Sequence, residues 1–147
     1  MTVLKSRMSA DPQFPANERS ARDWAMIVDD DDALRAFVTE QFLAMNIEAV
    51  AAARGETALR FAVERGSAPL VVLIDAMVTG MDCLTLAARL QARFKRQTKI
   101  VILSSKVHAA VTWPPEVSDL ALLPKPFQFT DLIALVKEAR ASRPKPL

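Results

Sequence analysis

Five side chains suited to phosphoryl chemistry stand where apolar runs of the sequence end. Asp29 and Asp30 close one run and Asp75 closes another, while Ser104 and Lys125 end two more. Carboxylate oxygens suit a hard cation such as Mg²⁺, and a carboxylate can act as a nucleophile toward phosphorus. A cation and the ammonium group would neutralise charge on the transferred group. The serine hydroxyl could donate a hydrogen bond to a phosphoryl oxygen.

Short apolar runs alternate with helical patterns along the chain, and these elements must position the five side chains. The runs predict strands over residues 24–28, 47–52, 70–74, 100–103 and 120–123. Apolar residues at helical spacing predict helices over 33–45 and 55–65, another after the third strand, and a last one over 130–139. Strands without interrupting polar residues are typical of parallel sheets that are covered on both faces. The alternation therefore predicts an α/β fold with a doubly wound, five-stranded parallel sheet.

The apolar stripes also predict which side of each helix is buried. On the first helix the stripe consists of Leu34, Phe37, Val38, Phe42 and Met45. On the third helix it consists of Leu84, Ala87, Leu90 and Phe94, and on the last one of Leu132, Ile133, Leu135 and Val136. Thr130 is expected to be the N-cap of the last helix, because a hydroxyl there can accept a hydrogen bond from the first turn.

Parallel strands bring their carboxyl ends to one edge of the sheet, where ligands bind. We therefore expect the three aspartates, the serine and the lysine to meet at that edge. Two like charges about 4 Å apart repel by roughly 4 kcal/mol at an effective dielectric of about 20. A divalent cation would relieve this repulsion and leave room for phosphate oxygens.

Composition excludes several other classes of protein. The chain has 147 residues, a length that suits one domain, and 51% of them are hydrophobic, which argues against a wholly disordered chain. Its net charge of +2 does not predict nucleic-acid binding. The single cysteine, Cys83, excludes an intramolecular disulfide, and the single histidine, His108, argues against a histidine-based metal site. No apolar run is long enough for a membrane span. A cytoplasmic protein is expected.

Four stretches of the sequence resemble the receiver domain of two-component response regulators. They are MIVDDDDALR, VVLIDAMVTGMDCL, VILSS and LLPKPF, which resemble the first strand with its acidic turn, the phosphoacceptor strand and loop, the fourth strand and the fifth strand. They stand in the family's order, and the resemblance covers about residues 24–140. It implies a flavodoxin-like sheet with strand order 2-1-3-4-5, helices on both faces, and a cis peptide bond between Lys125 and Pro126.

The resemblance also implies a magnesium site. Asp30 would bind Mg²⁺ directly and Asp29 through water, while Asp75 and the backbone carbonyl of Met77 would be further ligands. Asp75 would accept the phosphoryl group.

Beside Asp75, Ser104 and Lys125 would contact the phosphoryl oxygens. The donor would be a phosphohistidine on a sensor histidine kinase or a histidine phosphotransfer protein. The phosphorylated domain would signal to a downstream protein by contact, either as a monomer or as a homodimer. Residues 141–147 are too few for an output domain, so direct control of transcription is not expected.

The sequence departs from the family's pattern at four places. Thr79 replaces the usual proline of the phosphoacceptor loop, and Cys83 replaces the usual glycine before the third helix. Leu122 stands where the family's switch has an aromatic residue. Pro114 and Pro115 predict a shortened or irregular fourth helix. The phosphorylation chemistry is expected to be intact and the readout surface to be altered.

Other interpretations remain open on the sequence alone. The domain could be a pseudo-receiver, a scaffold or adaptor whose binding is independent of phosphorylation. An aspartate-nucleophile phosphatase would need an acidic residue where Met77 stands, and with three glycines there is no Gly-rich phosphate loop. The run from Asp29 to Asp32 could be only the acidic N-terminus of a helix. Residues 1–23 are interpreted as a flexible leader, 24–140 as the receiver domain and 141–147 as a basic tail.

Overall fold

Five parallel strands form the centre of the molecule. The computed structural model describes residues 23–105 and 119–144. The strands are β1 (Trp24–Val28), β2 (Glu48–Ala52), β3 (Val71–Asp75), β4 (Lys99–Ser104) and β5 (Leu120–Pro124). All neighbouring pairs are parallel, and their order is β2-β1-β3-β4-β5. This confirms both the fold class and the strand order expected from the sequence.

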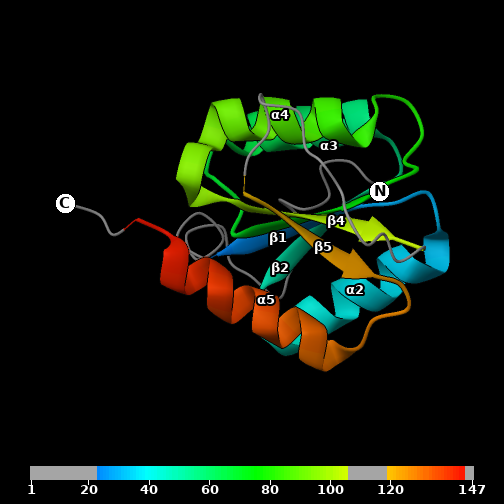
Figure 1. The fold of residues 1–147 in the computed structure, drawn as a ribbon, viewed down its shortest axis with the longest axis vertical. Helices are drawn as coiled ribbons and strands as arrows, with labels where there is room; N and C mark the ends of the chain where they lie inside the picture. The colour runs from blue at the N-terminus through cyan, green and yellow to red at the C-terminus, as the bar shows by residue number, and fades with distance from the viewer. Residues whose placement is uncertain (1–22, 106–118, 145–147) are drawn as a thin grey trace.

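Helices cover both faces of the sheet, as Figure 1 shows. One face carries α3 (Gly55–Arg65) and α4 (Cys83–Phe94), and the other carries α2 (Asp32–Ala44) and α5 (Phe129–Ser142). A short 3₁₀ turn, η2 (Lys95–Gln97), follows α4. The irregular helix predicted around Pro114 and Pro115 lies outside the described residues, as do His108 and most of the predicted leader. In the part of the chain that the structure describes, no helix is long and apolar enough to cross a bilayer.

Two hydrophobic cores result from the alternation of side chains along the strands. On β1, Met26 and Val28 face the layer of α3 and α4, whereas Ala25 and Ile27 face the layer of α2 and α5. Every residue of β1 and β3 is buried. At about 25 cal/mol per Å² of apolar area, burial on both faces makes these two strands the best-anchored part of the fold.

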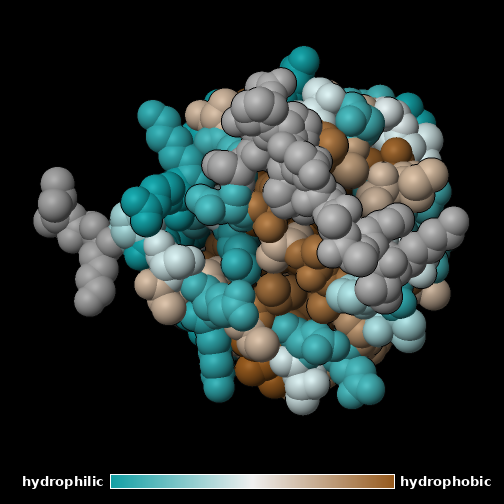
Figure 2. All heavy atoms as spheres, viewed as in Figure 1, coloured by the Kyte–Doolittle hydropathy of each residue, from teal (hydrophilic) through white to brown (hydrophobic). Residues whose placement is uncertain are grey.

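β5 is an edge strand, and its packing is looser. Its first four residues are half-buried, and Figure 2 shows hydrophobic residues gathered over it in the middle of the view. Leu122, which stands where the family has an aromatic residue, packs against the core on the α4 side.

Three predictions about the helices are wrong in detail. Phe37 is 38% exposed, because it lies at the rim of the α2 stripe beside the ring of Phe127. On α4 the buried leucine of the first turn is Leu86, which belongs to the core, whereas Leu84 is only half-buried and lies outside that cluster. The N-cap of α5 is Gln128 instead of Thr130.

Strand register places the carboxyl ends of β1, β3 and β4 side by side. Val28 pairs with Ile74, so Asp29 and Asp75 follow neighbouring positions of β1 and β3. Asp75 pairs with Leu103, the residue before Ser104. The chain after β5 returns to the same edge, because the backbone N–H of Lys125 donates to the carbonyl of Ser104 at 2.7 Å.

Candidate functional site

Three carboxylates meet at this edge. Asp29, Asp30 and Asp75 each offer an oxygen, and these oxygens lie within 4.8 Å of one another. Asp29 is 1% exposed and Asp75 is 8% exposed, whereas Asp30 is open to solvent. The site therefore combines two buried carboxylates with one that solvent or a partner can reach.

Lys125 neutralises part of this negative charge. Its Nζ donates to Oδ2 of Asp29 at 2.8 Å and to Oδ1 of Asp75 at 3.3 Å. Burial alone would lower the pKa of Lys125, but the hydrogen bond to Asp29 and the charges of Asp29 and Asp75 outweigh burial and raise its pKa above the usual value. The Lys125–Pro126 peptide bond is cis, as the family resemblance implies.

Asp29 already has a partner on each carboxylate oxygen. Its Oδ1 accepts from the backbone N–H of Asp31 at 2.9 Å, and its Oδ2 accepts from Lys125. The guanidinium of Arg35 donates to the backbone carbonyl oxygen of Asp29 at 2.7 Å and so holds the backbone between β1 and α2 in place. This arrangement leaves Asp30 as the less constrained carboxylate.

The donor set fits Mg²⁺. That ion prefers oxygen ligands, binds through one or two carboxylates and retains several waters. Asp30 and Asp75 could supply the direct oxygens, and the engaged carboxylate of Asp29 could hold a bound water. The exposed side of the cluster would leave room for water and for phosphoryl oxygens.

The remaining predicted residues lie at the same edge. Ser104 ends β4 and is 5% exposed. Met77 lies in the loop after Asp75, and its side chain is 80% exposed. The loop leaves the strand in a fixed way, since the N–H of Ala76 donates to the carbonyl of Leu103 at 2.8 Å and the N–H of Val78 to that of Asp75 at 3.1 Å.

Two departures from the family's pattern can be placed in the structure. The Thr79 hydroxyl donates to Oδ2 of Asp30 at 3.4 Å, a contact that proline could not make. Cys83 is the first residue of α4 and has no positive φ, so the strain that a side chain at a glycine position could cause does not arise. Burial, and then the charges of Asp82 and Asp75, raise the pKa of the Cys83 thiol, which keeps it protonated at neutral pH.

Sequence reasoning missed the contacts that support the phosphoacceptor loop from α3. The N–H of Gly55 donates to the carbonyl of Thr79 at 3.1 Å, and Glu56 lies against the loop near Gly80. A glycine at position 80 is typical of a turn, but the sequence does not indicate that Glu56 lies against this turn.

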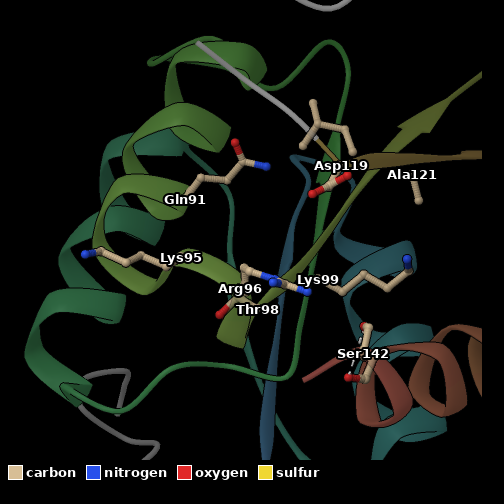
Figure 3. Close-up of a pocket in the computed structure, with 10 residues that line it drawn as sticks. Gln91, Lys95, Arg96, Thr98, Lys99, Asp119, Ala121 and Ser142 are labelled. Atoms are coloured by element: carbon tan, nitrogen blue, oxygen red, sulfur yellow. Dashed lines mark hydrogen bonds between the residues drawn. The ribbon is translucent and has the colours of Figure 1, made fainter. Parts of the chain in front are cut away.

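A polar pocket lies at the opposite edge of the sheet, near the amino ends of β4 and β5. In Figure 3, Gln91 and Arg96 point into it and Lys95 extends away. It is lined further by Thr98, Lys99, Asp119 and Ser142, among others. None of the predicted site residues lines it, so it is separate from the acidic cluster.

Comparison with known proteins gives a consistent result. Residues 25–137 match the response regulator receiver domain family. A receiver domain of a Francisella response regulator is 25% identical, with 82% of this chain and 98% of that chain covered and a TM-score of 0.67. A response regulator receiver protein from Sinorhizobium medicae is 24% identical, with 83% and 97% covered and a TM-score of 0.68.

A third similar structure is a CheY-like receiver domain from Methylobacillus flagellatus, 24% identical, with 80% of this chain and 98% of that chain covered and a TM-score of 0.68. No curated protein matches the chain. The family match spans most of the sequence and includes every residue of the acidic cluster. The chain belongs to the response regulator receiver domain family, the phosphoacceptor domains of two-component signalling.

Proposed function

We propose that this receiver domain accepts a phosphoryl group on Asp75 in the presence of Mg²⁺. The observation that supports the proposal best is the meeting of Asp29, Asp30 and Asp75 with the ammonium of Lys125 at one edge of the sheet. Without a bound metal ion, three carboxylates beside one ammonium group would leave an unfavourable concentration of negative charge. It is a suitable environment for a phosphoryl group bound between carboxylates and a lysine.

The proposed reaction is a transfer from phosphohistidine. A carboxylate oxygen of Asp75 attacks phosphorus, an O–P bond forms and the P–N bond breaks. The imidazole leaves with the electron pair and takes a proton from solvent. Lys125 and Ser104 stabilise the charge on the phosphoryl oxygens. A bound Mg²⁺ supplies further neutralisation of the carboxylates and the phosphoryl group.

Signalling would follow from the change at Lys125. In the unphosphorylated domain this lysine contacts both Asp29 and Asp75. A phosphoryl group adds about −1.5 to −2 charges at neutral pH and would compete for the ammonium. The resulting rearrangement would bias the surface near β5 and α5, and a cytoplasmic partner protein would read it. The proposed donor is a histidine kinase or a histidine phosphotransfer protein, the class of partner with which receiver domains interact.

A pseudo-receiver is the second candidate, and Leu122 favours it, because an aliphatic side chain replaces the aromatic residue of the family's switch. The two candidates differ at Asp75. If binding to the partner is unchanged by Asp75→Asn and by phosphodonor, the pseudo-receiver is correct.

The test is incubation with acetyl phosphate and Mg²⁺, followed by intact mass spectrometry. Wild type should gain the mass of one HPO₃ group, and Asp75→Asn should not. Asp119→Asn is the matched control, because Asp119 lies at the opposite edge and has a positive φ that asparagine accepts. Lack of modification of wild type, or equal modification of the Asp75→Asn variant, would contradict the proposal.

A further inference from the structure

The loop that follows Asp75 is tied to the start of α3, a segment distant in sequence. The backbone N–H of Gly55 donates to the carbonyl of Thr79 at 3.1 Å, and Arg54 forms an isolated parallel bridge with Thr79. The first turn of α3 therefore serves as a support for the phosphoacceptor loop.

Glu56 strengthens this support. Its carboxylate accepts a hydrogen bond from Arg54 at 3.1 Å and lies against the loop at Gly80, with the backbone N–H groups of Glu56 and Met81 close enough to affect its charge. These interactions lower the pKa of Glu56, with its own backbone N–H as the largest cause and Arg54 next. The carboxylate is thus ionised at neutral pH and holds the far end of the loop.

The two glycines of this contact show how closely the segments approach. Gly80 has a φ of +84°, and a Cβ there would lie 2.0 Å from Oε1 of Glu56. A Cβ on Gly55 would lie 2.5 Å from the backbone oxygen of Met81. The Cβ on Gly55 would meet backbone that has to shift, whereas the Cβ on Gly80 would meet only the flexible end of the Glu56 side chain, so the loop lies directly on α3 at Gly55.

The same loop reaches the metal-binding edge at its other side. Thr79, whose carbonyl accepts from Gly55, also donates its hydroxyl to Asp30 at 3.4 Å. A displacement of the loop from α3 would therefore change the positions of Thr79 and Met77 relative to Asp30 and Asp75.

We propose that Glu56 is a positioning residue of the phosphorylation site: by holding the loop of residues 76–81 on α3, it sets the affinity of the acidic cluster for Mg²⁺ and the rate at which Asp75 is phosphorylated. The inference rests on the proposed function, because it concerns the same site. It adds a residue outside the acidic cluster that touches neither the metal ion nor the phosphoryl group.

The test is to compare Mg²⁺ affinity by calorimetry, phosphorylation rate with acetyl phosphate and thermal stability in wild type, Glu56→Ala and Glu56→Gln. Groups that bond directly to metal ligands typically contribute about tenfold to a hundredfold in affinity. Glu56 acts one step further out, through the loop, so we expect Glu56→Ala to weaken Mg²⁺ binding by only about threefold to tenfold. Glu56→Gln should recover part of this loss, because the amide keeps the shape of the side chain against Gly80 and its oxygen can still accept from Arg54. Glu64→Gln, an exposed change on the same helix, is the control and should match wild type.

Gly55→Ala is the second perturbation. Alanine favours helix, but its Cβ would meet a backbone atom of the loop that cannot rotate away. We expect the same loss of Mg²⁺ affinity while α3 remains folded. If Glu56→Ala and Gly55→Ala both bind Mg²⁺ and are phosphorylated like wild type, the positioning role is wrong and the proposed function stands. If wild type itself neither binds Mg²⁺ nor is phosphorylated, the proposed function fails and the positioning role fails with it.

Discussion

At the scale of single residues, the site is a balance of charge around a buried carboxylate. Asp29 is 1% exposed and would be strongly disfavoured as an anion without partners. Its carboxylate has two partners, the N–H of Asp31 and the ammonium of Lys125, and Arg35 separately fixes its backbone carbonyl. Lys125 also contacts Asp75, so it connects Asp29 to the proposed phosphoacceptor.

Replacing Lys125 should therefore destabilise the fold as well as impair the chemistry. Lys125→Met leaves Asp29 buried without its cation, and we expect a loss of about 2 kcal/mol in the free energy of unfolding, less than for a fully buried pair because the lysine is partly exposed. Urea denaturation in EDTA measures the loss. The double variant with Asp29→Asn should recover much of it, and an unchanged midpoint in Lys125→Met would contradict the assigned ion pairs.

The raised pKa of Lys125 predicts a pH dependence with a definite sign. Because the folded-state pKa lies above the ordinary value of 10.5, the stabilisation from the charged lysine is complete below about that pH and is lost as pH rises through the folded pKa. The difference in stability between wild type and Lys125→Met should therefore be constant near neutral pH and shrink at strongly alkaline pH. A difference that shrinks instead between neutral pH and pH 10 or so would show that the pKa is not raised.

At the scale of elements, helix ends position the loops around the site. Asp31 caps α2 by accepting from the N–H groups of Ala33 and Leu34. At α5, Gln128 and Asp131 form a reciprocal capping box, in which the N–H of Gln128 donates to Asp131 at 2.7 Å. The short segment from Lys125 to Gln128 is thus held between the site and a fixed helix start.

The capping box gives a prediction that distinguishes two possible starts of α5. Asp131→Ala should reduce the free energy of unfolding by about 1 kcal/mol, whereas Thr130→Ala should change it by less than about 0.5 kcal/mol. Thermal denaturation of the two variants checks this. If Thr130→Ala proved the more destabilising change, the helix would begin at threonine after all.

Particular elements show what the sequence could and could not predict. Four of the five strands were predictable because each is a short apolar run with a polar residue at or just after its end, whereas β2 contains Glu48 and is followed by Ala53. The common edge of a parallel sheet then brought Asp29, Asp75 and Lys125 together. Thr130 was a plausible cap, but the competing pair of Gln128 and Asp131 wins through two reciprocal hydrogen bonds. The contact between Glu56 and the loop near Gly80 was not predictable, because it depends on the path of two loops and has no periodicity.

At the scale of the whole molecule, the site residues come from strands that differ in how deeply they are buried. Asp29 and Asp75 follow the two strands that are buried on both faces, whereas Lys125 follows the half-buried edge strand β5. Asp29 and Asp75 therefore follow the fully buried centre of the sheet, and Lys125 follows an edge strand that is less completely packed. Such an arrangement suits a rigid acceptor with a responsive neighbour.

Binding of Mg²⁺ should stabilise the whole fold. A ligand that binds only the native state adds about 2.7 kcal/mol when its concentration is one hundred times the dissociation constant. We expect the melting temperature to rise with added Mg²⁺ and to fall on addition of EDTA. Asp30→Asn should lose most of this response, and a response in that variant equal to wild type would contradict the assignment of Asp30 as a ligand.

The most direct test of the central claim is calorimetric titration with beryllofluoride, which imitates a phosphoryl group on a carboxylate. Its binding requires the carboxylate of Asp75, the neighbouring acidic residues and Lys125 to act together. We predict binding at a one-to-one ratio in the presence of Mg²⁺, none in EDTA, and none for Asp75→Asn in either condition. Equal binding by wild type and Asp75→Asn, or binding by wild type that is indifferent to Mg²⁺, would contradict the account.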